Sequence, residues 1–220
     1  MKRVGRRYRP QRVDEHYDVI VIGSGIGGLA NAALLSRLGR RVCVLEQHYT
    51  AGGFTHTYER NGYEWDVGVH YIGEVHKPYS PLRRIFDVIS DGQLQWAQMD
   101  DTYDRIIIGG ERYDFRVGRE QFAEDLKARF PEEADAIDRY VDLVVRVAGS
   151  MRNFFTGQAL SPGMNWLYRL IRDQRVPKEC TMTVRGVLES LTQNQQLIGV
   201  LTGQWGDYGM PPAEATFLMH

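Results

Sequence analysis

The chain has 220 residues, 43% of them hydrophobic, with a formal net charge of −1 and two cysteines, Cys43 and Cys180. This length and composition predict a globular protein of one to one and a half domains without a disulfide framework, for which a reducing, cytoplasmic location is expected. No apolar stretch before Asp18 indicates a secretory signal, and no apolar run is long enough to predict a membrane-spanning helix.

The N-terminal residues, 1–16, form a basic arm. Its basic residues all precede the first acidic residue, and they are Lys2, Arg3, Arg6, Arg7, Arg9 and Arg12. Such an arm is typical of a contact with nucleic acid or with an anionic membrane, and equally of a flexible, solvated tail. We expect the solvated tail, and no nucleic-acid partner.

A strand, a helix and a second strand are the first elements that the pattern predicts. The apolar run DVIVIG begins at Asp18 and is followed by a glycine-rich turn. A helix is expected over 27–38, with Gly39 as its C-terminal cap, and a second strand over 41–46.

The turn after the first strand has the pattern G-x-G-x-x-G, formed by Gly23, Gly25 and Gly28. Between a strand and a helix, the first glycine allows a tight turn, the second lets backbone N–H groups approach a pyrophosphate, and the third allows close packing of helix on strand. The helix N-terminus attracts the anion. Glu46, which ends the second strand, is expected to accept hydrogen bonds from ribose hydroxyls. The pattern predicts a site for an adenosine diphosphate group without a 2′-phosphate, which both NAD and FAD contain.

The segment after Glu46 favours FAD. In a simple NAD domain the second strand leads to another helix and a third parallel strand. Here it leads to a loop with Gly52 and Gly53, and then to two alternating runs joined at Asn61 and Gly62, which predict a β-hairpin. The backbone of a paired-glycine loop can approach a dinucleotide without side-chain clash.

Helices and antiparallel strands are expected in the rest of the chain. They are a helix beginning at Ser80, strands over 94–99, 103–108 and 111–117, a helix marked by Phe122, Leu126 and Phe130, and a helix opened by Pro131. The last helix has an apolar stripe formed by Ile137, Tyr140, Val141, Val144 and Ala148. The turn 209–214 is expected to open one more helix.

Together the elements predict an α/β fold. An FAD-binding, Rossmann-type domain, doubly wound but partial, is expected over 17–100, followed over 101–220 by an α+β portion of a substrate or cap domain. Two strands of the parallel sheet are recognisable, which leaves one face and both edges of a doubly wound sheet unfinished. We therefore expect the chain to be a C-terminally truncated piece of a longer protein.

Two stretches resemble the flavoprotein superfamily of phytoene desaturases, carotenoid isomerases and retinol saturase, and the retinol saturase branch most. The first stretch, from Tyr17 to about Val75, contains VIGSGIGG, EQH, the G-G-x-x-H-T loop and D-x-G-x-H-Y. The second is GQWGDYGMPPAEATF near the end of the sequence.

The resemblance implies FAD, and a lipophilic isoprenoid substrate with conjugated double bonds that the enzyme saturates, desaturates or isomerises. It also implies the residues at the cofactor, which are Gly23, Ser24, Gly25, Ile26, Gly27, Gly28, Glu46, Gln47, Gly52, Gly53, Phe54, Asp66 and Gly68. His70 is the catalytic candidate, as a proton donor or a contact of the flavin ring, and the alternative is a hydrogen-bonded structural histidine. No metal site is expected.

The segment 164–178 is a candidate for peripheral membrane contact. Its apolar residues on one side of an expected helix are Trp166, Leu167, Leu170 and Ile171, and its basic residues are Arg169, Arg172, Arg175 and Lys178. The alternative is a helix that packs its apolar side on the substrate domain. Two other functions also stay open, a flavin amine oxidase and a non-catalytic fragment that binds nucleotide weakly or not at all.

Overall fold

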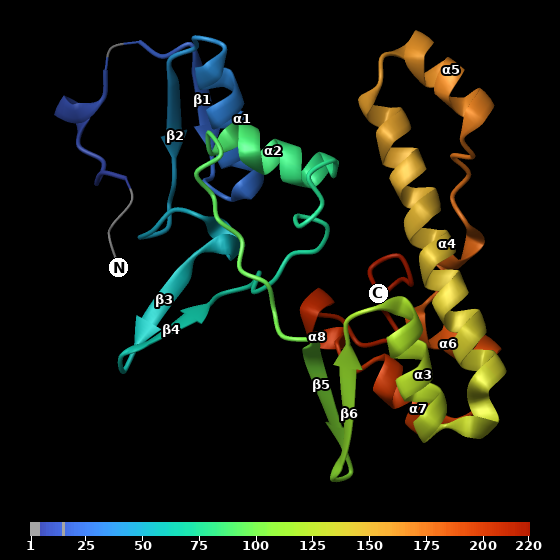
Figure 1. Ribbon diagram of the computed structural model, residues 1–220. Coiled ribbons are helices and arrows are strands. Elements are labelled where there is room, and N and C mark those ends of the chain that lie inside the picture. Colours follow the sequence, from blue (N-terminus) through green and yellow to red (C-terminus); the bar gives the residue numbers. More distant parts are fainter. Residues whose placement is uncertain (1–4, 15) are drawn as a thin grey trace. The chain divides into compact units, whose positions relative to one another are not determined.

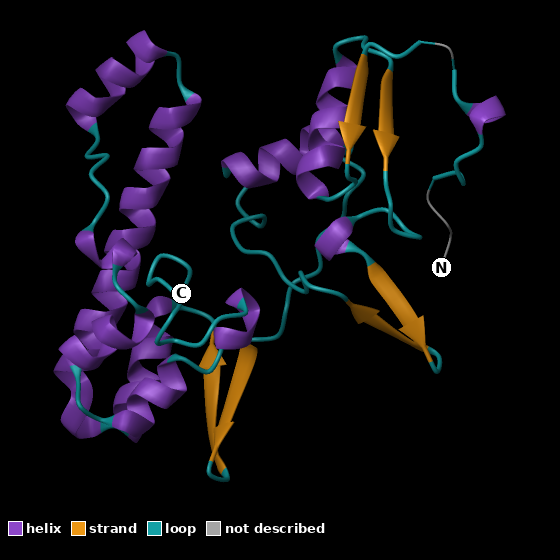
Figure 2. Cartoon of the chain, turned by 180° about the vertical axis from the view of Figure 1, so that it is seen from behind, coloured by secondary structure: helices purple, strands orange, loops and turns teal. Residues whose placement is uncertain are grey.

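Figure 1 shows the computed structural model, which describes residues 5–14 and 16–220. The chain divides into two compact units, Met1–Gln98 and Met99–His220. Both contain helices and strands, and each sheet formed by the described residues has two strands (Figure 2). The domain assignment to 1–16, 17–100 and 101–220 stays a prediction, and Lys2 and Arg3 of the basic arm lie outside the described residues.

The first unit contains the predicted strand–helix–strand arrangement. β1 (Val19–Ile22) and β2 (Val42–Leu45) pair in parallel, and α1 (Ile26–Arg37) connects them and contacts both. A parallel pair requires a crossover connection of this kind, whose helix packs on one face of the strands. Gly39 follows α1 with a φ of 77°, the left-handed conformation expected just after a helix.

An antiparallel hairpin follows. β3 (Thr57–Arg60) and β4 (Tyr63–Asp66) pair along their whole length. The turn residues Asn61 and Gly62 have φ values of 54° and 79°, the left-handed conformation that a tight two-residue hairpin turn requires. The prediction from the Asn-Gly pair is therefore confirmed.

One expected strand in this unit is wrong. The segment 94–99 is neither strand nor helix. It follows α2 (Pro81–Ile89), which begins after Ser80 as predicted. Trp96 packs its ring edge-on against Phe86 of this helix, with 5.1 Å between ring centroids. Trp96, one of the apolar residues on which the predicted strand depended, thus contacts the preceding helix.

The first unit buries few apolar side chains. Among its described residues, Ala32 and Val75 are the buried hydrophobic ones. Ile20 and Ile22, at alternate positions of β1, are 60% and 87% exposed. Because alternate residues of a strand point to the same face, the face of the sheet opposite α1 is apolar and uncovered.

The second unit begins with a β-hairpin and continues as helices. β5 (Thr102–Ile108) and β6 (Glu111–Arg116) are antiparallel, as predicted. The helices are α3 (Arg119–Arg129), α4 (Ala134–Ala159), α5 (Pro162–Ile171), α6 (Val184–Leu191), α7 (Gln195–Leu201) and α8 (Trp205–Tyr208). Among the described residues, no helix combines the length and the apolar composition that crossing a bilayer requires.

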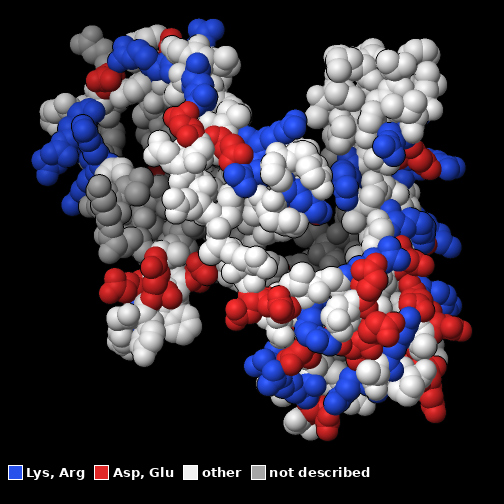
Figure 3. Space-filling model, viewed as in Figure 1, with Lys and Arg blue, Asp and Glu red and all other residues white. Residues whose placement is uncertain are grey.

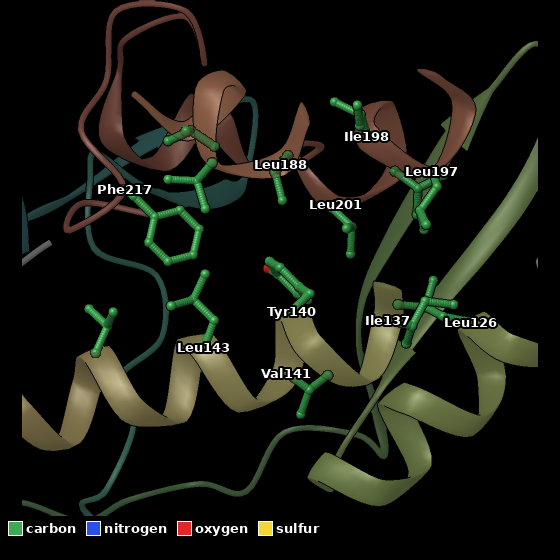
Figure 4. Close-up of a cluster of buried hydrophobic side chains, with 14 of the residues drawn as sticks. Leu126, Ile137, Tyr140, Val141, Leu143, Leu188, Leu197, Ile198, Leu201 and Phe217 are labelled. Atoms are coloured by element: carbon green, nitrogen blue, oxygen red, sulfur yellow. The ribbon is translucent and has the colours of Figure 1, made fainter. Parts of the chain in front are cut away.

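The core of the second unit lies between α4 and the helices α6 and α7 (Figure 4). Ile137 of α4, Leu188 of α6 and Val200 of α7 are completely buried. The predicted stripe of α4 is confirmed at Ile137, Tyr140 and Val141 but is wrong at Ala148, which is exposed. At spacings of three and four residues, the buried side continues instead through Leu143, Val147 and Met151.

The helix expected after the turn 209–214 is not present. The residues 211–219 form turns and lie against the start of α6. The carbonyl oxygens of Ala215 and Pro212 accept hydrogen bonds from the N–H groups of Val184 and Arg185, at 2.9 and 2.8 Å. These N–H groups lack partners inside their own helix, so the segment caps α6 instead of forming a new helix.

Candidate functional site

The glycine turn joins β1 tightly to α1. Gly23 has a φ of 93°, which side chains rarely tolerate. A Cβ atom at Gly28 would overlap the carbonyl oxygen of Gly23 and would lie 3.4 Å from Cγ1 of Val21. Glycine at position 28 therefore allows the first turn of α1 to pack directly on the end of β1.

The other side of the turn is open. Cβ atoms placed at Gly25 and Gly27 would have no described heavy atom within 4 Å beyond their immediate neighbours. Gly25 is the N-cap of α1, without a capping side chain, and the first turn has no acidic residue. Ile26 at the start of the helix is exposed. The first N–H groups of the helix can thus receive an anion.

Glu46 lies beside this turn, at the end of β2. Its Oε2 accepts hydrogen bonds from the backbone N–H of Ser24 at 2.8 Å and from the Ser24 hydroxyl at 2.5 Å. Its Oε1 accepts one from the backbone N–H of His48, also at 2.8 Å. Ser24 itself is 1% exposed. The acidic residue is therefore fixed in position against the glycine turn.

These hydrogen bonds keep Glu46 ionised. The Ser24 hydroxyl, followed by the backbone N–H groups of His48 and Ser24, lowers the pKa of the Glu46 carboxyl from 4.5 to about 2. A carboxylate offers about four lone-pair positions, of which three are used here. Glu46 therefore keeps the capacity to accept a further hydrogen bond from a hydroxyl group.

The loop with the paired glycines packs on the turn as well. The backbone N–H of Gly52 donates to the carbonyl oxygen of Ser24 at 3.0 Å, and Gly52 forms an isolated parallel bridge with Gly25. Gly53 has a φ of 56°, and a Cβ there would lie 2.9 Å from Cα of Gly25. The structure thus brings together two glycine loops that are distant in the sequence.

A cavity of about 500 Å³ opens next to these groups. Ser24, Glu46 and Gln47 line it, as do two segments that sequence reasoning missed, 5–8 of the basic arm and 48–51 after β2. The polar run that follows Glu46 could have indicated the second segment. No local signal indicates that residues 5–8 fold back to this place, because that contact is formed at long range.

The remaining predicted site residues lie in a neighbouring part of the unit. A Cβ at Gly68 would lie 2.9 Å from Cβ of Phe54, and the N–H of Val69 donates to the carbonyl oxygen of Phe54 at 2.9 Å. Asp66 ends β4 and is exposed. His70 is exposed too, with Nδ1 3.2 Å from the carbonyl oxygen of Gly68. The structure groups Phe54 with Gly68, but none of these four residues lines the cavity beside Glu46.

The arrangement fits an adenosine diphosphate group. There is open space over Gly25 and Gly27 at an uncapped helix start, which suits the pyrophosphate. The ionised Glu46, with acceptor capacity left, suits the ribose hydroxyls and would repel a 2′-phosphate. The cavity beside Ser24 and Glu46 provides space for the adenosine.

Comparison with known proteins shows what the chain is similar to. Residues 21–89 match the family model of the NAD(P)-binding Rossmann-like domain. An all-trans-retinol 13,14-reductase from Danio rerio is 41% identical over 217 residues, which is 95% of this chain and 36% of that protein. Prolycopene isomerase 2, chloroplastic, from Oncidium hybrid cultivar is 30% identical over 169 residues, which is 76% of this chain and 28% of that protein. A solved structure of wild-type putrescine oxidase bound to putrescine has a TM-score of 0.46 at 19% identity, covering 84% of this chain and 36% of that one.

The similarity to the reductase extends over nearly the whole chain and includes both units. The chain spans 36% of the length of that relative. The Rossmann-like match contains the glycine turn, α1, β2 and Glu46, which is the region where the structure forms the site. Over 95% of its length the chain is therefore similar to one part of an all-trans-retinol 13,14-reductase, and over 76% to one part of a prolycopene isomerase.

Proposed function

We propose that this chain contains the dinucleotide-binding part of an FAD-dependent oxidoreductase that acts on C=C bonds of a lipophilic polyene. The observation that carries the proposal is the pairing of Ser24 and Glu46 beside an open glycine turn, in a chain 41% identical to a protein named all-trans-retinol 13,14-reductase. The pairing supports a bound adenosine diphosphate group, and the relatives' names support the polyene substrate.

The course of the chain after β2 supports FAD over NAD. In place of a second crossover helix and a third parallel strand, the structure has the Gly52–Gly53 loop against the glycine turn, followed by the hairpin of β3 and β4. Because Gly52 and Gly53 have no side chains, only the backbone of this loop lies near Gly25. A long cofactor that continues past the pyrophosphate would run along this backbone.

We assign the residues at the cofactor as follows. The N–H groups at the start of α1 and the glycine turn would hold the pyrophosphate, and Glu46 would accept from the ribose, with Ser24 fixing its position. Gly52 and Gly53 would lie along the cofactor, and Phe54, Asp66 and Gly68 further along the same side of the unit. FAD supplies hydride chemistry at its ring system when bound, while the protein binds and orients it and excludes water.

His70 stays our proposal for a proton donor. The ring is exposed and its Nδ1 has a carbonyl partner, which leaves the opposite nitrogen, Nε2, directed away from that contact. The test is His70→Gln in the full-length protein, with His76→Gln as the matched control, because His76 is exposed in the same segment. We expect His70→Gln to lower turnover and to leave FAD binding intact. Equal turnover in both variants would remove His70 from the mechanism.

A substrate of this kind dissolves in lipid, so we also propose that the protein meets a membrane peripherally. The test of the proposed function is incubation of the full-length protein with all-trans-retinol and a reductant, followed by chromatography. The expected product has a shorter conjugated system and therefore absorbs at shorter wavelength. An unchanged polyene, together with oxidation of an added amine, would contradict the proposal.

A further inference from the structure

An exposed apolar face lies on α5, the helix after the end of α4. The side chains of this face, called here the α5 face, are Met164, Trp166, Leu167, Leu170 and Ile171. Each is between 59% and 74% exposed. At 100° per residue they occupy one side of the helix. They form a continuous apolar stripe as wide as the stripe with which a surface helix usually packs on a protein core.

The helix packs on the protein with its polar side. The Tyr168 hydroxyl donates to Oδ1 of Asn153 on α4 at 3.2 Å. Gln174, after the helix, donates to Oδ1 of Asn165 on α5 at 2.9 Å. Gly157 of α4 makes room for Gln174, because a Cβ there would overlap the Gln174 side chain. These contacts hold the α5 face directed away from α4, the reverse of how a surface helix of a globular domain is normally placed.

The charge on α5 and on the chain before it is of one sign, and the first acidic residue after the helix is Asp173. From Leu143 to Arg172 the sequence contains no Asp or Glu. Arg169 and Arg172 are exposed, and neither has an ion-pair partner among the residues that the structure describes. Arg175 lies beyond them and pairs with Asp173 at 2.8 Å. In Figure 3 this end of the second unit is white over nearly all of its visible surface, with blue and red side chains at its base.

We propose that the α5 face inserts into the surface of an anionic lipid bilayer. A Trp and four aliphatic side chains on one side, with unpaired arginines beside them and no acidic residue, are the composition of a helix that lies in a membrane interface. The arginines would contact anionic headgroups while the α5 face enters the boundary of the acyl chains. The inference deepens the proposed function and rests on it for the reason why the protein visits a membrane.

The helix ends at Ile171, so the four apolar residues expected on one side of a helix all lie on α5, and the segment 164–178 continues beyond it. Arg169 belongs to α5, whereas Arg172, Arg175 and Lys178 follow it in an extended stretch and a single helical turn. The proposed contact is therefore shorter than the sequence suggested. It consists of α5 itself with Arg169 and Arg172.

Flotation of the 220-residue chain with phosphatidylcholine vesicles, with or without phosphatidylserine, tests the proposal. The variant is Leu170→Gln, and the matched control is Ile107→Gln on β5, because the two side chains are 65% and 66% exposed in the same unit. We expect binding to serine-containing vesicles, roughly tenfold weaker binding for Leu170→Gln, and no change for Ile107→Gln. Equal binding of all three proteins would overturn the proposal.

Two further measurements show whether the α5 face binds lipid or a second copy of the chain. Brominated lipid should quench Trp fluorescence of the wild type, and most of that quenching should be lost in Trp166→Phe. A dimer that Leu170→Gln dissociates, without vesicle binding, would overturn the proposal in favour of a second copy of the chain. No flavin is needed, so failure here is distinguishable from failure of the proposed function.

Discussion

Ser24 and Glu46 connect the two loops that follow the parallel strands of the first unit. The backbone N–H and the hydroxyl of Ser24 both donate to the same carboxylate oxygen of Glu46. This pair fixes Glu46, which we propose accepts hydrogen bonds from the ribose, against the glycine turn before any ligand arrives. Such positioning lowers the ordering cost of binding a flexible dinucleotide.

Ser24→Ala should loosen this contact. The hydroxyl of Ser24 is the largest cause of the low pKa of the Glu46 carboxyl, so its removal should raise that pKa toward the ordinary value of 4.5. We also expect weaker adenosine diphosphate binding, because the carboxylate is less well held. NMR titration of the Glu46 carboxyl measures the first effect and calorimetry the second. A pKa unchanged from that of the wild type would contradict the described hydrogen bond.

Two glycine substitutions should separate folding from binding. Gly28→Ala puts a methyl group onto the carbonyl of Gly23, and overpacking of this kind costs about 1–3 kcal/mol. Gly25→Ala meets open space at a φ of −62°, so it should leave the free energy of unfolding nearly unchanged and instead block the pyrophosphate. Denaturant unfolding and ligand titration measure the two effects. Gly73→Ala, also in open space, is the control, and it should change neither.

The pH dependence that Glu46 contributes should lie at strongly acidic pH. Its pKa is lowered to about 2 in the folded chain, from an ordinary value of 4.5. The stabilisation from the ionised group is thus fully present above about pH 4.5 and is lost as the pH falls toward 2. Adenosine diphosphate binding should therefore show no titration of Glu46 between pH 5 and 8. Comparison of the binding profiles of the wild type and Glu46→Gln checks this, and a wild-type step within that range that Glu46→Gln removes would contradict it.

His220 should make the second unit sensitive to mildly acidic pH. Its ring contacts the Tyr140 hydroxyl at 2.9 Å, and burial lowers the pKa of His220 from 6.5 to about 4. Between these values the unfolded chain binds more protons, so stability falls as the pH drops from about 6.5 to 4, by at most about 3 kcal/mol.

His220 is the sole histidine of the second unit. Urea unfolding followed by the fluorescence of that unit, at pH 7 and pH 4.5, measures the loss of stability. His220→Gln should remove most of the difference between the two pH values. The same loss in wild type and variant would show that other groups cause it.

Local patterns predicted the parts of the fold in which local and long-range interactions agree. The strand–helix–strand unit follows from a short apolar run, a glycine turn and a helix that ends before Gly39, and the β3–β4 hairpin from Asn61 and Gly62. The strand predicted over 94–99 is absent because Trp96 packs on Phe86 of the preceding helix. The helix expected after the turn 209–214 does not form because the carbonyl groups of Pro212 and Ala215 cap α6, about thirty residues earlier in the sequence.

The candidate site divides in the same way. Gly23, Gly28 and Glu46 were predictable because each has a fixed place in the strand–turn–helix pattern, and the structure brings them together. The packing of Gly53 on Gly25 could not be predicted, because the sequence indicated a loop near the cofactor but not the contact of this loop with the glycine turn. The lining by residues 5–8 was missed because a basic arm has no pattern that indicates its path.

The proposed cofactor site is tested by equilibrium binding of FAD, FMN and NADP⁺ to the 220-residue chain and to Gly25→Ala. We expect the chain to bind FAD through its adenosine diphosphate part and to bind FMN, which lacks this part, much more weakly. We also expect Glu46 to disfavour the 2′-phosphate of NADP⁺. Gly25→Ala should lose FAD binding while remaining folded. Binding of FAD and FMN with equal affinity, or unchanged FAD binding by Gly25→Ala, would show that the glycine turn and Glu46 do not form the cofactor site.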